Sequence, residues 1–516
     1  DNDGWTDLIA ISGRGASVEV LRNVDGTGVF QSIAYTPIGD TIQSQGASVG
    51  DFNDDGYVDF YIGGYEIWPG TSFPDKLVLN APVTPTATNP HGRGFVHAWT
   101  QSDLSRARGI TSADWNEDGR LDVYVSNYRL QPNLLWVNNG NGSDFPFDNG
   151  ASTYHADGDS GHSIGSAWGD MDSDGLIDLL AGNFAHAGQP EPHILMNQGP
   201  NQNYAFHDRN GEGETGIPYV ESYASPSFGD FDNDGMLDLL YTALVSSYGD
   251  SNVLMRNVGT PGNPFFADVT GAMGLPTNGW GDYQVTWADI DNDGDLDLGA
   301  AGRLWRNDTV NNNNWLKVQL RGNGTTVDGS AIGAQVRVTA GDLIVTRQVE
   351  SGTGQGQVND LTLHFGLGTY SGSLEVEVFW PDGTVRTVHA NPNQSIRIPY
   401  NLTVVGGADI GEVGTVVVTD VSQTVNLDRV YENPVVFAQS ASTNGQQPVV
   451  VRVNNVQVDR FDIFLAEPSN LDGAHGGETV TYVVLETGTH TLQDGTQLEV
   501  GTVNTSATVG RHNDNT

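Results

Sequence analysis

Short apolar runs alternate with turn residues along the whole chain. In residues 58–62, 121–125 and 374–380, apolar side chains recur at about every second position, which is typical of β-strands with one face in a core. Clusters of Gly, Asn, Asp and Pro separate the runs, as expected for tight turns. A parallel α/β fold would require amphipathic helices, and no segment has a helical period. The pattern predicts an all-β protein.

An acidic stretch interrupts this pattern about every sixty residues. Five complete copies have the sequences DFNDDGYVD, DWNEDGRLD, DMDSDGLID, DFDNDGMLD and DIDNDGDLD, beginning at Asp51, Asp114, Asp170, Asp230 and Asp289. The first residues, DNDGWTD, match a sixth copy that lacks its first two positions, so the chain begins inside a repeat. Repeats of this length define the architecture of a chain.

The residue types at each position of the stretch indicate a calcium loop. Positions 1, 3, 5 and 9 are Asp or Asn in every complete copy, and position 6 is always Gly. Oxygen ligands at alternate positions, followed by a Gly that permits a sharp turn, suit a hard cation of the size of calcium. Because the last ligand falls at position 9 rather than 12, these loops are not EF-hands. The alternative is a set of acidic turns without metal, which six copies disfavour.

The sequence therefore predicts about six calcium sites. The predicted side-chain ligands are Asp1, Asp3 and Asp7; Asp51, Asn53, Asp55 and Asp59; Asp114, Asn116, Asp118 and Asp122; Asp170, Asp172, Asp174 and Asp178; Asp230, Asp232, Asp234 and Asp238; and Asp289, Asp291, Asp293 and Asp297. Position 7 varies freely, so we expect only its backbone carbonyl to bind; these residues are Trp5, Tyr57, Arg120, Leu176, Met236 and Asp295. We expect each ion to act as a structural clamp, because the carboxylates of one loop repel one another until a divalent cation lies among them.

The segments around each loop complete a unit of four short strands. Small and apolar residues precede the loop, and an apolar run follows it. A third run ends in Asn, as in KLVLN and HILMN, and a fourth is marked by Gly and aromatic residues. Four strands in a unit of this length predict a β-propeller with six visible blades.

Over residues 1–310 the loops and their flanks resemble the FG-GAP (VCBS-type) repeats of integrin α-subunit propellers and their bacterial relatives. The resemblance implies that calcium lies in the hairpin between the first two strands of each blade. Propellers of that family usually have seven blades, whereas this chain shows six loops, and the first copy lacks its first ligand and inner strand. Either native sequence lies upstream, which we favour, or a strand from elsewhere pairs with the open edge.

Two smaller β-domains are predicted after the repeats. Residues 311–402 resemble the ASPIC/UnbV domain that follows FG-GAP repeats in many bacterial secreted proteins, on the motifs NWLKVQLRG, AIGAQVRVTAG, LHFGLG and VEVFWPDG. Alternating strands over residues 403–516 predict a β-sandwich that resembles lectin-like or adhesin-associated domains. We assign His364 to the core, and His475 and Glu478 to a turn without function.

Composition restricts the partners and the location. The chain has 64 acidic and 22 basic residues, for a net charge of −42, which argues against nucleic acid and anionic membrane surfaces as partners of the chain as a whole. It has no Cys, which excludes disulfides and thiolate metal sites. Calcium loops of this kind fill at the millimolar calcium found outside cells. We therefore expect an extracellular or cell-surface protein, and no membrane insertion.

Two groups of residues match catalytic patterns in part. GHSIG at residues 161–165 fits the G-x-S-x-G pattern around Ser163, but a calcium loop begins where that motif requires a helix. His155, His162, His186 and His193 fall in or next to one blade, without the spacing of a zinc protease. We expect no catalytic site.

These observations favour a secreted calcium-binding adhesion or recognition protein. Its partner would be an extracellular protein or carbohydrate, or copies of itself in a filament or surface layer. The alternative is a polysaccharide-active enzyme that uses the mouth of the propeller, with carboxylates or the four histidines as acid and base. An enzyme should bring acid and base groups together away from the calcium loops, whereas an adhesion protein should present extended surface contacts.

Overall fold

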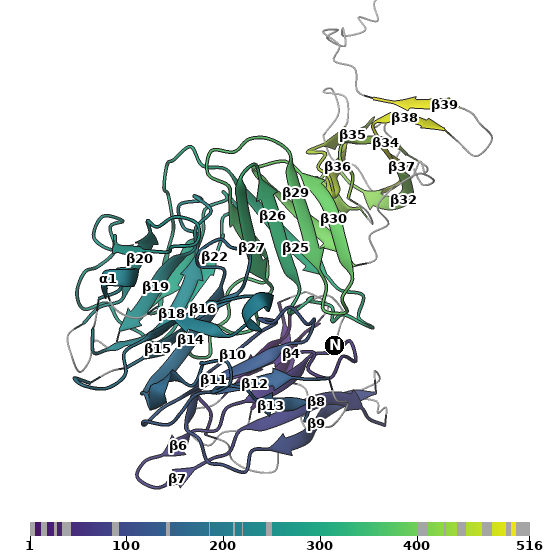
Figure 1. Ribbon diagram of the computed structural model, residues 1–516. Helices are drawn as coiled ribbons and strands as arrows, with labels where there is room; N and C mark the ends of the chain where they lie inside the picture. The colour runs from purple at the N-terminus through teal and green to yellow at the C-terminus, as the bar shows by residue number, and fades with distance from the viewer. Residues whose placement is uncertain are drawn as a thin grey trace, which may run out of the picture. The chain divides into compact units, whose positions relative to one another are not determined.

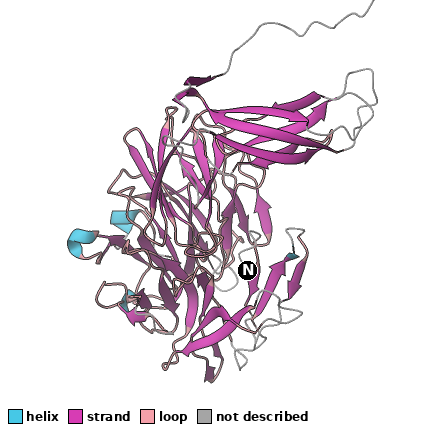
Figure 2. Cartoon of the chain, turned by 90° about the vertical axis from the view of Figure 1, so that its right-hand side faces the viewer, coloured by secondary structure: helices cyan, strands magenta, loops and turns pink. Residues whose placement is uncertain are grey.

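The computed structural model (Figure 1) describes residues 6–11, 18–24, 28–32, 43–84, 92–140, 145–184, 186–209, 212–218, 220–243, 250–400, 411–427, 430–440, 450–466, 477–491 and 497–501. These residues form two compact units, residues 1–395 and 396–516. Strands dominate both (Figure 2), and helix in the described part is limited to α1 (Glu212–Thr215) and 3-10 turns at Gly158–Ser160 and Pro200–Gln202. None of the described helices is long and apolar enough to cross a membrane.

Six antiparallel sheets follow one another along the repeats, and each is one propeller blade. The first has β1 (Leu8–Ala10), β2 (Glu19–Asn23) and β3 (Phe30–Ser32), and the second has β4 (Ala47–Gly50), β5 (Asp59–Ile62), β8 (Lys76–Pro82) and β9 (Arg93–Thr100). A hairpin of β6 (Glu66–Ile67) and β7 (Thr71–Ser72) projects from the second sheet. The third has β10 (Ala107–Ala113), β11 (Asp122–Asn127), β12 (Leu134–Asn138) and β13 (Phe147–Asn149).

The fourth and fifth blades have the same four-stranded order. The fourth has β14 (Ser163–Gly169), β15 (Asp178–Asn183), β16 (His193–Asn197) and β17 (Phe206–Asp208), and the fifth has β18 (Tyr223–Gly229), β19 (Asp238–Ala243), β20 (Val253–Asn257) and β21 (Phe266–Asp268). The sixth has only β22 (Val285–Ala288), β23 (Asp297–Ala300) and β24 (Arg303–Trp305). The predicted all-β architecture with six propeller blades is confirmed.

The first and sixth blades each have three described strands instead of four. The first begins with the strand that follows the acidic loop, as the truncated first copy predicts. The sixth differs from the four-strand prediction because the chain after β24 turns back onto the neighbouring acidic loop. There Asn311 and Asn313 donate side-chain hydrogen bonds to Asp232 O, at 2.7 and 2.9 Å. The segment that would form a fourth strand therefore leads into the next sheets.

The core of the propeller lies between successive blades. Tyr124 of the third blade and Trp168 of the fourth belong to one buried cluster. Leu180 of the fourth and Leu239 of the fifth belong to the next. Since each blade buries one face against its neighbour, the stack of sheets is stabilised blade by blade through the hydrophobic effect.

Residues 351–359, which we call the axial segment, lie along the first strands of the blades. Ser351 Oγ is 3.0 Å from Ser48 Oγ of β4 and also contacts β10. Gly354 exchanges two backbone hydrogen bonds with Ser166 of β14, and the end of the segment accepts one from the main chain of β22. One short segment thus contacts four first strands, which therefore surround a common axis that the segment occupies.

The axial segment belongs to a pair of sheets that follows the blades in the chain. One sheet has the order β28 (Leu363–Gly366), β25 (Trp315–Arg321) and β31 (Gln394–Pro399). The other has the order β27 (Leu343–Gln348), β26 (Gln335–Ala340), β29 (Leu374–Phe379) and β30 (Val385–Ala390). The alternating run at residues 374–380 forms β29, which ends one residue earlier than the run.

The second unit has two three-stranded sheets and a hairpin. The sheets have the orders β32 (Gly411–Val418), β37 (Glu478–Glu486), β34 (Pro434–Ser440) and β33 (Gln423–Asn426), β36 (Arg460–Ala466), β35 (Val450–Asn454), and the hairpin has β38 (Gly488–Thr491) and β39 (Gln497–Val500). Phe461 of β36 and Val484 of β37 are fully buried in one cluster shared by the two sheets. Both sheets thus bury one face in a common core, as in a β-sandwich.

Candidate metal centres

Each acidic loop is the hairpin that joins the first two strands of a blade. The last residue of the first strand pairs with the ninth-position Asp, as Gly169 does with Asp178. The backbone is left-handed at position 4 of all five complete loops and has positive φ at the position-6 Gly; φ is 58° at Ser173 and 95° at Gly175. Any side chain at Gly175 would be strained at this φ. The recurring Gly therefore makes the turn possible.

Backbone donors hold the carboxylates of positions 1 and 5. In the fourth blade, Asp174 N and Gly175 N donate to the two oxygens of Asp170 at 3.0 and 3.2 Å. The same two contacts recur in the loops that begin at residues 51, 114 and 230. Leu176 N donates to Asp174 Oδ1 at 2.9 Å. The loop thus positions these carboxylates before any cation binds.

The Asp at position 9 is held by the Asn that ends the third strand. In the fourth blade, Asn197 N donates to Asp178 Oδ1 at 2.8 Å. The equivalent contact occurs in all six copies at 2.7 or 2.8 Å, including Asn23 N to Asp7 Oδ1 in the first. This contact ties the acidic loop to the third strand of its own blade.

The same Asn side chains also join neighbouring blades. Asn197 Nδ2 donates to Trp115 O, at position 2 of the preceding loop, at 2.8 Å. The equivalent pairs are Asn138 with Phe52, Asn257 with Met171, and Asn307 with Phe231. We call these residues the interblade asparagines. The sequence shows the recurring Asn, but its partner lies in another repeat, so sequence reasoning missed this role.

Three loops bring three carboxylates close enough to share one ion. The groups are Asp170, Asp172 and Asp178; Asp230, Asp232 and Asp234; and Asp289, Asp291 and Asp297, each with one ligand atom per residue within 4.8 Å of the others. The loops that begin at residues 51 and 114 have Asn at position 3 and offer an amide oxygen there. The predicted ligands Asp1, Asp3 and Trp5 lie outside the described residues.

Electrostatics favour a cation in these loops. Burial is the largest cause that raises the pKa of Asp170 to about 7, and neighbouring carboxylates add to it. Burial and the Asp174 charge raise the pKa of Asp172 to about 6. Asp232 Oδ1 and Asp289 Oδ1 are buried and make no hydrogen bond to a described residue. Unpartnered buried oxygens beside other carboxylates fit the oxygen-ligand set of a hard divalent cation.

Comparison with known proteins agrees with this geometry. A model described as FG-GAP-like repeat matches residues 1–62, 94–181 and 230–300, and a model described as ASPIC and UnbV matches residues 324–403. The chain contains FG-GAP-like repeats and an ASPIC/UnbV domain. This confirms the architecture inferred from the motifs.

The chain is similar to human cartilage acidic protein 1, with 27% identity over 303 residues that cover 55% of this chain and 42% of the relative. It is also similar to halomucin of Haloquadratum walsbyi, with 37% identity over 89 residues, 16% of this chain and 1% of halomucin. An Agrocybe aegerita lectin of known structure aligns with 60% of this chain and 78% of its own, at 16% identity and a TM-score of 0.36. That score is too low to inform function. The chain spans less than half the length of the cartilage acidic proteins it matches.

The ASPIC/UnbV domain packs directly on the acidic loops of the FG-GAP repeats. Lys317 Nζ of β25 donates to Asp289 Oδ2 at 2.8 Å and to Asn292 Oδ1 at 3.0 Å, and both charged groups of this pair are buried. Thr346 N of β27 donates to Asp170 Oδ2 at 3.3 Å. The domain therefore contributes donors to the loops of two blades.

The glycines at position 6 form part of the same contact. A Cβ at Gly119 would lie 2.7 Å from Pro381 O, and one at Gly56 would lie 2.3 Å from Thr325 O. In the sixth blade a Cβ at Gly294 would overlap the indole of Trp315. Position 6 thus requires Gly twice, for the turn and for the close approach of the ASPIC/UnbV domain.

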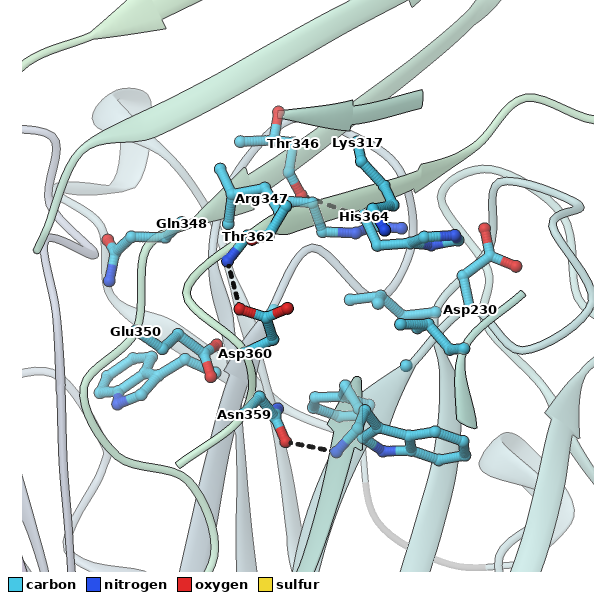
Figure 3. Close-up of a pocket in the computed structure, with 18 of the residues that line it drawn as sticks. Asp230, Lys317, Thr346, Arg347, Gln348, Glu350, Asn359, Asp360, Thr362 and His364 are labelled. Atoms are coloured by element: carbon cyan, nitrogen blue, oxygen red, sulfur yellow. Dashed lines mark hydrogen bonds between the residues drawn. The ribbon is translucent and has the colours of Figure 1, made fainter. Parts of the chain in front are cut away.

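A cavity of about 90 Å³, lined by both apolar and charged side chains, lies between the FG-GAP repeats and this domain (Figure 3). Asp230 lines it from the repeats, and Arg347, Glu350 and His364 line it from the domain. Burial raises the pKa of Glu350 to about 8 and lowers that of His364 to about 4. His364 is a buried residue whose Nε2 lies 2.9 Å from Gly294 O. A space of this size holds roughly three water molecules.

Among the described residues, two of the four histidines lie together, and Ser163 is hydrogen-bonded within its own blade. Ser163 lies on strand β14, and its hydroxyl donates to Asn183 Oδ1 at 2.6 Å. His193 Nδ1 is 2.7 Å from Asp208 Oδ2. Of the four histidines, His162 and His186 are in ring contact, with centroids 5.9 Å apart. His475 lies outside the described residues, while Glu478 is buried on β37.

Proposed function

We propose that this protein is an extracellular recognition protein whose FG-GAP propeller is clamped by calcium. The observation that carries the proposal is the set of three carboxylate triads, each with ligand atoms within 4.8 Å and each with at least one buried carboxylate. Loops of carboxylate, amide and carbonyl oxygens suit calcium better than magnesium, which demands a smaller octahedral site. Because such sites fill at the calcium levels found outside cells, the proposal includes an extracellular location.

The axial segment supports recognition rather than catalysis at the propeller mouth. It fills the space between the first strands with residues such as Ser351 and Gly354. A polysaccharide chain entering the axis from the acidic-loop side would have to displace this segment. We therefore place partner binding on exposed surfaces of the propeller or of the C-terminal domain.

Thermal unfolding in the presence and absence of calcium tests the clamp. A ligand that binds only the native state stabilises it by about 3 kcal/mol per site when its concentration is about a hundred times the Kd. We expect the melting temperature to fall by many degrees after chelation and to recover with calcium, but not with an equal concentration of magnesium. An unchanged melting temperature would refute the clamp.

A filament or surface-layer role stays a prediction, and sedimentation velocity in calcium tests it. Open blade edges can pair with a strand of another chain. A concentration-dependent series of assemblies is the expected result for a filament subunit. A single monomeric species at all concentrations contradicts it and leaves the recognition role intact.

A further inference from the structure

The end of the axis away from the acidic loops carries a cluster of aromatic and basic side chains. Arg108 lies at the start of β10, six residues before Asp114 and thus about 20 Å along the strand from its loop. Tyr65 and Tyr128 follow the second strands of their blades, where the antiparallel chains return to this end. Tyr283 lies two residues before the first strand of the sixth blade, β22. The chain therefore brings one arginine and three tyrosines from three blades together.

Arg108 is surrounded by rings but has no acidic partner among the described residues. Its guanidinium carbon lies 5.5 Å from the ring centroid of Tyr65 and 5.1 Å from those of Tyr128 and Tyr283. Its hydrogen-bond partner is the neutral amide of Gln355, from the axial segment. Arg108 as a whole is half-buried.

Two neighbouring arginines at this end of the axis pair with a carboxylate. Arg106 Nε lies 2.8 Å from Glu66 Oε2, and Arg129 pairs with the other oxygen of the same carboxylate. Arg108, which lies two residues from Arg106 on the same stretch of chain, has no carboxylate partner among the described residues. The positive charge of Arg108 is therefore available to an anionic ligand.

Aromatic and imidazole groups extend the cluster on both sides. The ring centroids of Tyr128 and His162 lie 4.7 Å apart, and the His162 ring also contacts the His186 ring, at 5.9 Å. On the other side Arg129 lies 4.3 Å from the ring centroid of Trp68, whose side chain is 69% exposed. Tyr65 and Tyr128 are themselves half-buried. Aromatic rings and one guanidinium without a described carboxylate partner thus lie together at this end of the axis.

We propose that this surface, the axial aromatic site (Tyr65, Trp68, Arg108, Tyr128 and His162), binds the carboxylated sugar units of an acidic polysaccharide. A planar guanidinium binds a carboxylate through two parallel hydrogen bonds. The rigid rings of Trp and Tyr offer apolar faces for the C–H face of a sugar and polar edges for its hydroxyls, with few rotatable bonds to restrict. A flexible acidic side chain of a protein would use the arginine but not this aromatic platform. The proposal rests on the recognition function above, for which it names the site and the ligand class.

Calorimetric titration with a glucuronic acid hexasaccharide tests the site in the presence of saturating calcium. The hexasaccharide with its carboxyl groups reduced to alcohols is the matched ligand control, and a hexaglutamate peptide tests a protein partner. We expect the glucuronate to bind, the reduced sugar to bind at least about tenfold more weakly, and the peptide to show no saturation. Absence of glucuronate binding, equal binding of the reduced sugar, or saturable binding of the peptide alone each overturns the proposal.

Variants locate the binding on this surface. Arg108→Gln should weaken glucuronate binding at least about tenfold, whereas Arg452→Gln, an exposed arginine of β35 in the second unit, should leave it unchanged. Trp68→Ala is the second variant, because an exposed side chain can be removed without unfolding the blade, and we expect about threefold to tenfold weaker binding. Unchanged binding in both site variants refutes the site.

The melting temperature of each sample, with calcium and after chelation, separates this proposal from the previous one. A protein that is stabilised by calcium but does not bind glucuronate refutes the axial aromatic site alone. A protein that binds glucuronate without calcium stabilisation refutes the clamp alone. If Arg108→Gln lowers the melting temperature markedly, its loss of binding has two explanations. Glucuronate binding by Trp68→Ala then decides: weaker binding supports the axial aromatic site, and unchanged binding refutes it.

Discussion

The five complete acidic loops share one backbone but differ by one carboxylate at the predicted ligand positions. In the loops that begin at residues 170, 230 and 289, position 3 is Asp, and three carboxylates lie together; we call these the Asp-type loops. In the loops that begin at residues 51 and 114, position 3 is Asn53 or Asn116; these are the Asn-type loops. The hydrogen bonds from positions 5 and 6 to the first carboxylate occur in both types.

This difference shows that the shape of a loop and its charge are determined by different residues. Because the backbone network persists with one carboxylate fewer, the turn residues and the Asn of the third strand determine the shape. The number of carboxylates then determines how strongly the loop repels itself and how strongly it attracts a divalent cation. Both loop types should therefore fold alike with calcium and differ without it.

The largest expected effect is the pH dependence of the chelated protein. Burial raises the pKa of Asp170 to about 7 and that of Asp172 to about 6, above the ordinary value of 3.8. Between about pH 4 and pH 7 the folded state then binds more protons than the unfolded chain. The two carboxyl groups therefore stabilise the fold fully below about pH 4. This stabilisation is lost as the pH rises through about 7. Urea unfolding should show a lower free energy of unfolding at about pH 7.5 than at about pH 5.

Calcium should abolish this fall, because a bound cation keeps the carboxylates ionised in the folded state. Asp172→Asn, which converts an Asp-type loop into an Asn-type loop, should make the fall in the chelated protein shallower. A chelated protein that becomes more stable from about pH 5 to about pH 7.5 contradicts the electrostatic account of both loop types.

The second effect concerns the framework that the two types share. Asn138→Ala leaves Phe52 O, at an Asn-type loop, without its donor, and Asn257→Ala does the same to Met171 O at an Asp-type loop. A buried carbonyl without a partner costs about 1–3 kcal/mol. We expect both variants to lose about 2 kcal/mol in urea unfolding with calcium present. A loss confined to one of them would mean that charge, not the framework, joins the blades.

Much of the loop could be predicted from the sequence because its determinants are local. The turn at Gly175 and the alternation of Asp170, Asp172 and Asp174 are properties of adjacent residues, and six copies make the pattern visible. The hairpin position followed from the apolar residues on either side of position 9. These features require no knowledge of what packs against the loop.

The missed features depend on contacts between distant parts of the chain. Asn197 reaches Trp115 in the preceding blade, and Lys317 reaches Asp289 from another sheet pair. The axial segment has the composition of an ordinary polar loop, yet it lies between the first strands. Arg108 and its tyrosines come from three blades, so no spacing in the sequence brings them together. Only the propeller geometry creates these neighbours.

The third prediction exchanges the two loop types. Asn53→Asp gives the loop that begins at residue 51 a further carboxylate, whereas Asp172→Asn removes one from the loop that begins at residue 170. Charge count tunes the calcium affinity of oxygen-ligand loops. We expect a tighter site by about tenfold for Asn53→Asp and a weaker site by about tenfold for Asp172→Asn, equivalent to about 1.4 kcal/mol each. Competition with a chromophoric chelator measures both, and Asn454→Asp, on β35 of the second unit, is the matched charge control.

The smallest effect concerns Arg93, a cation that the second blade places beside its own acidic loop. Arg93 Nη2 lies 2.6 Å from Asp55 Oδ2, with both side chains partly exposed. A partly exposed ion pair contributes about 0.2–1 kcal/mol. Calcium binding that breaks this pair to use Asp55 as a ligand is therefore weakened by at most about 1 kcal/mol of binding free energy. Arg93→Gln should therefore raise the calcium affinity of this Asn-type loop by about twofold to fivefold in the same competition assay. A lower affinity would show that Arg93 holds Asp55 in position for the ion, and the loop would then depend on its cation as well as on its carboxylates.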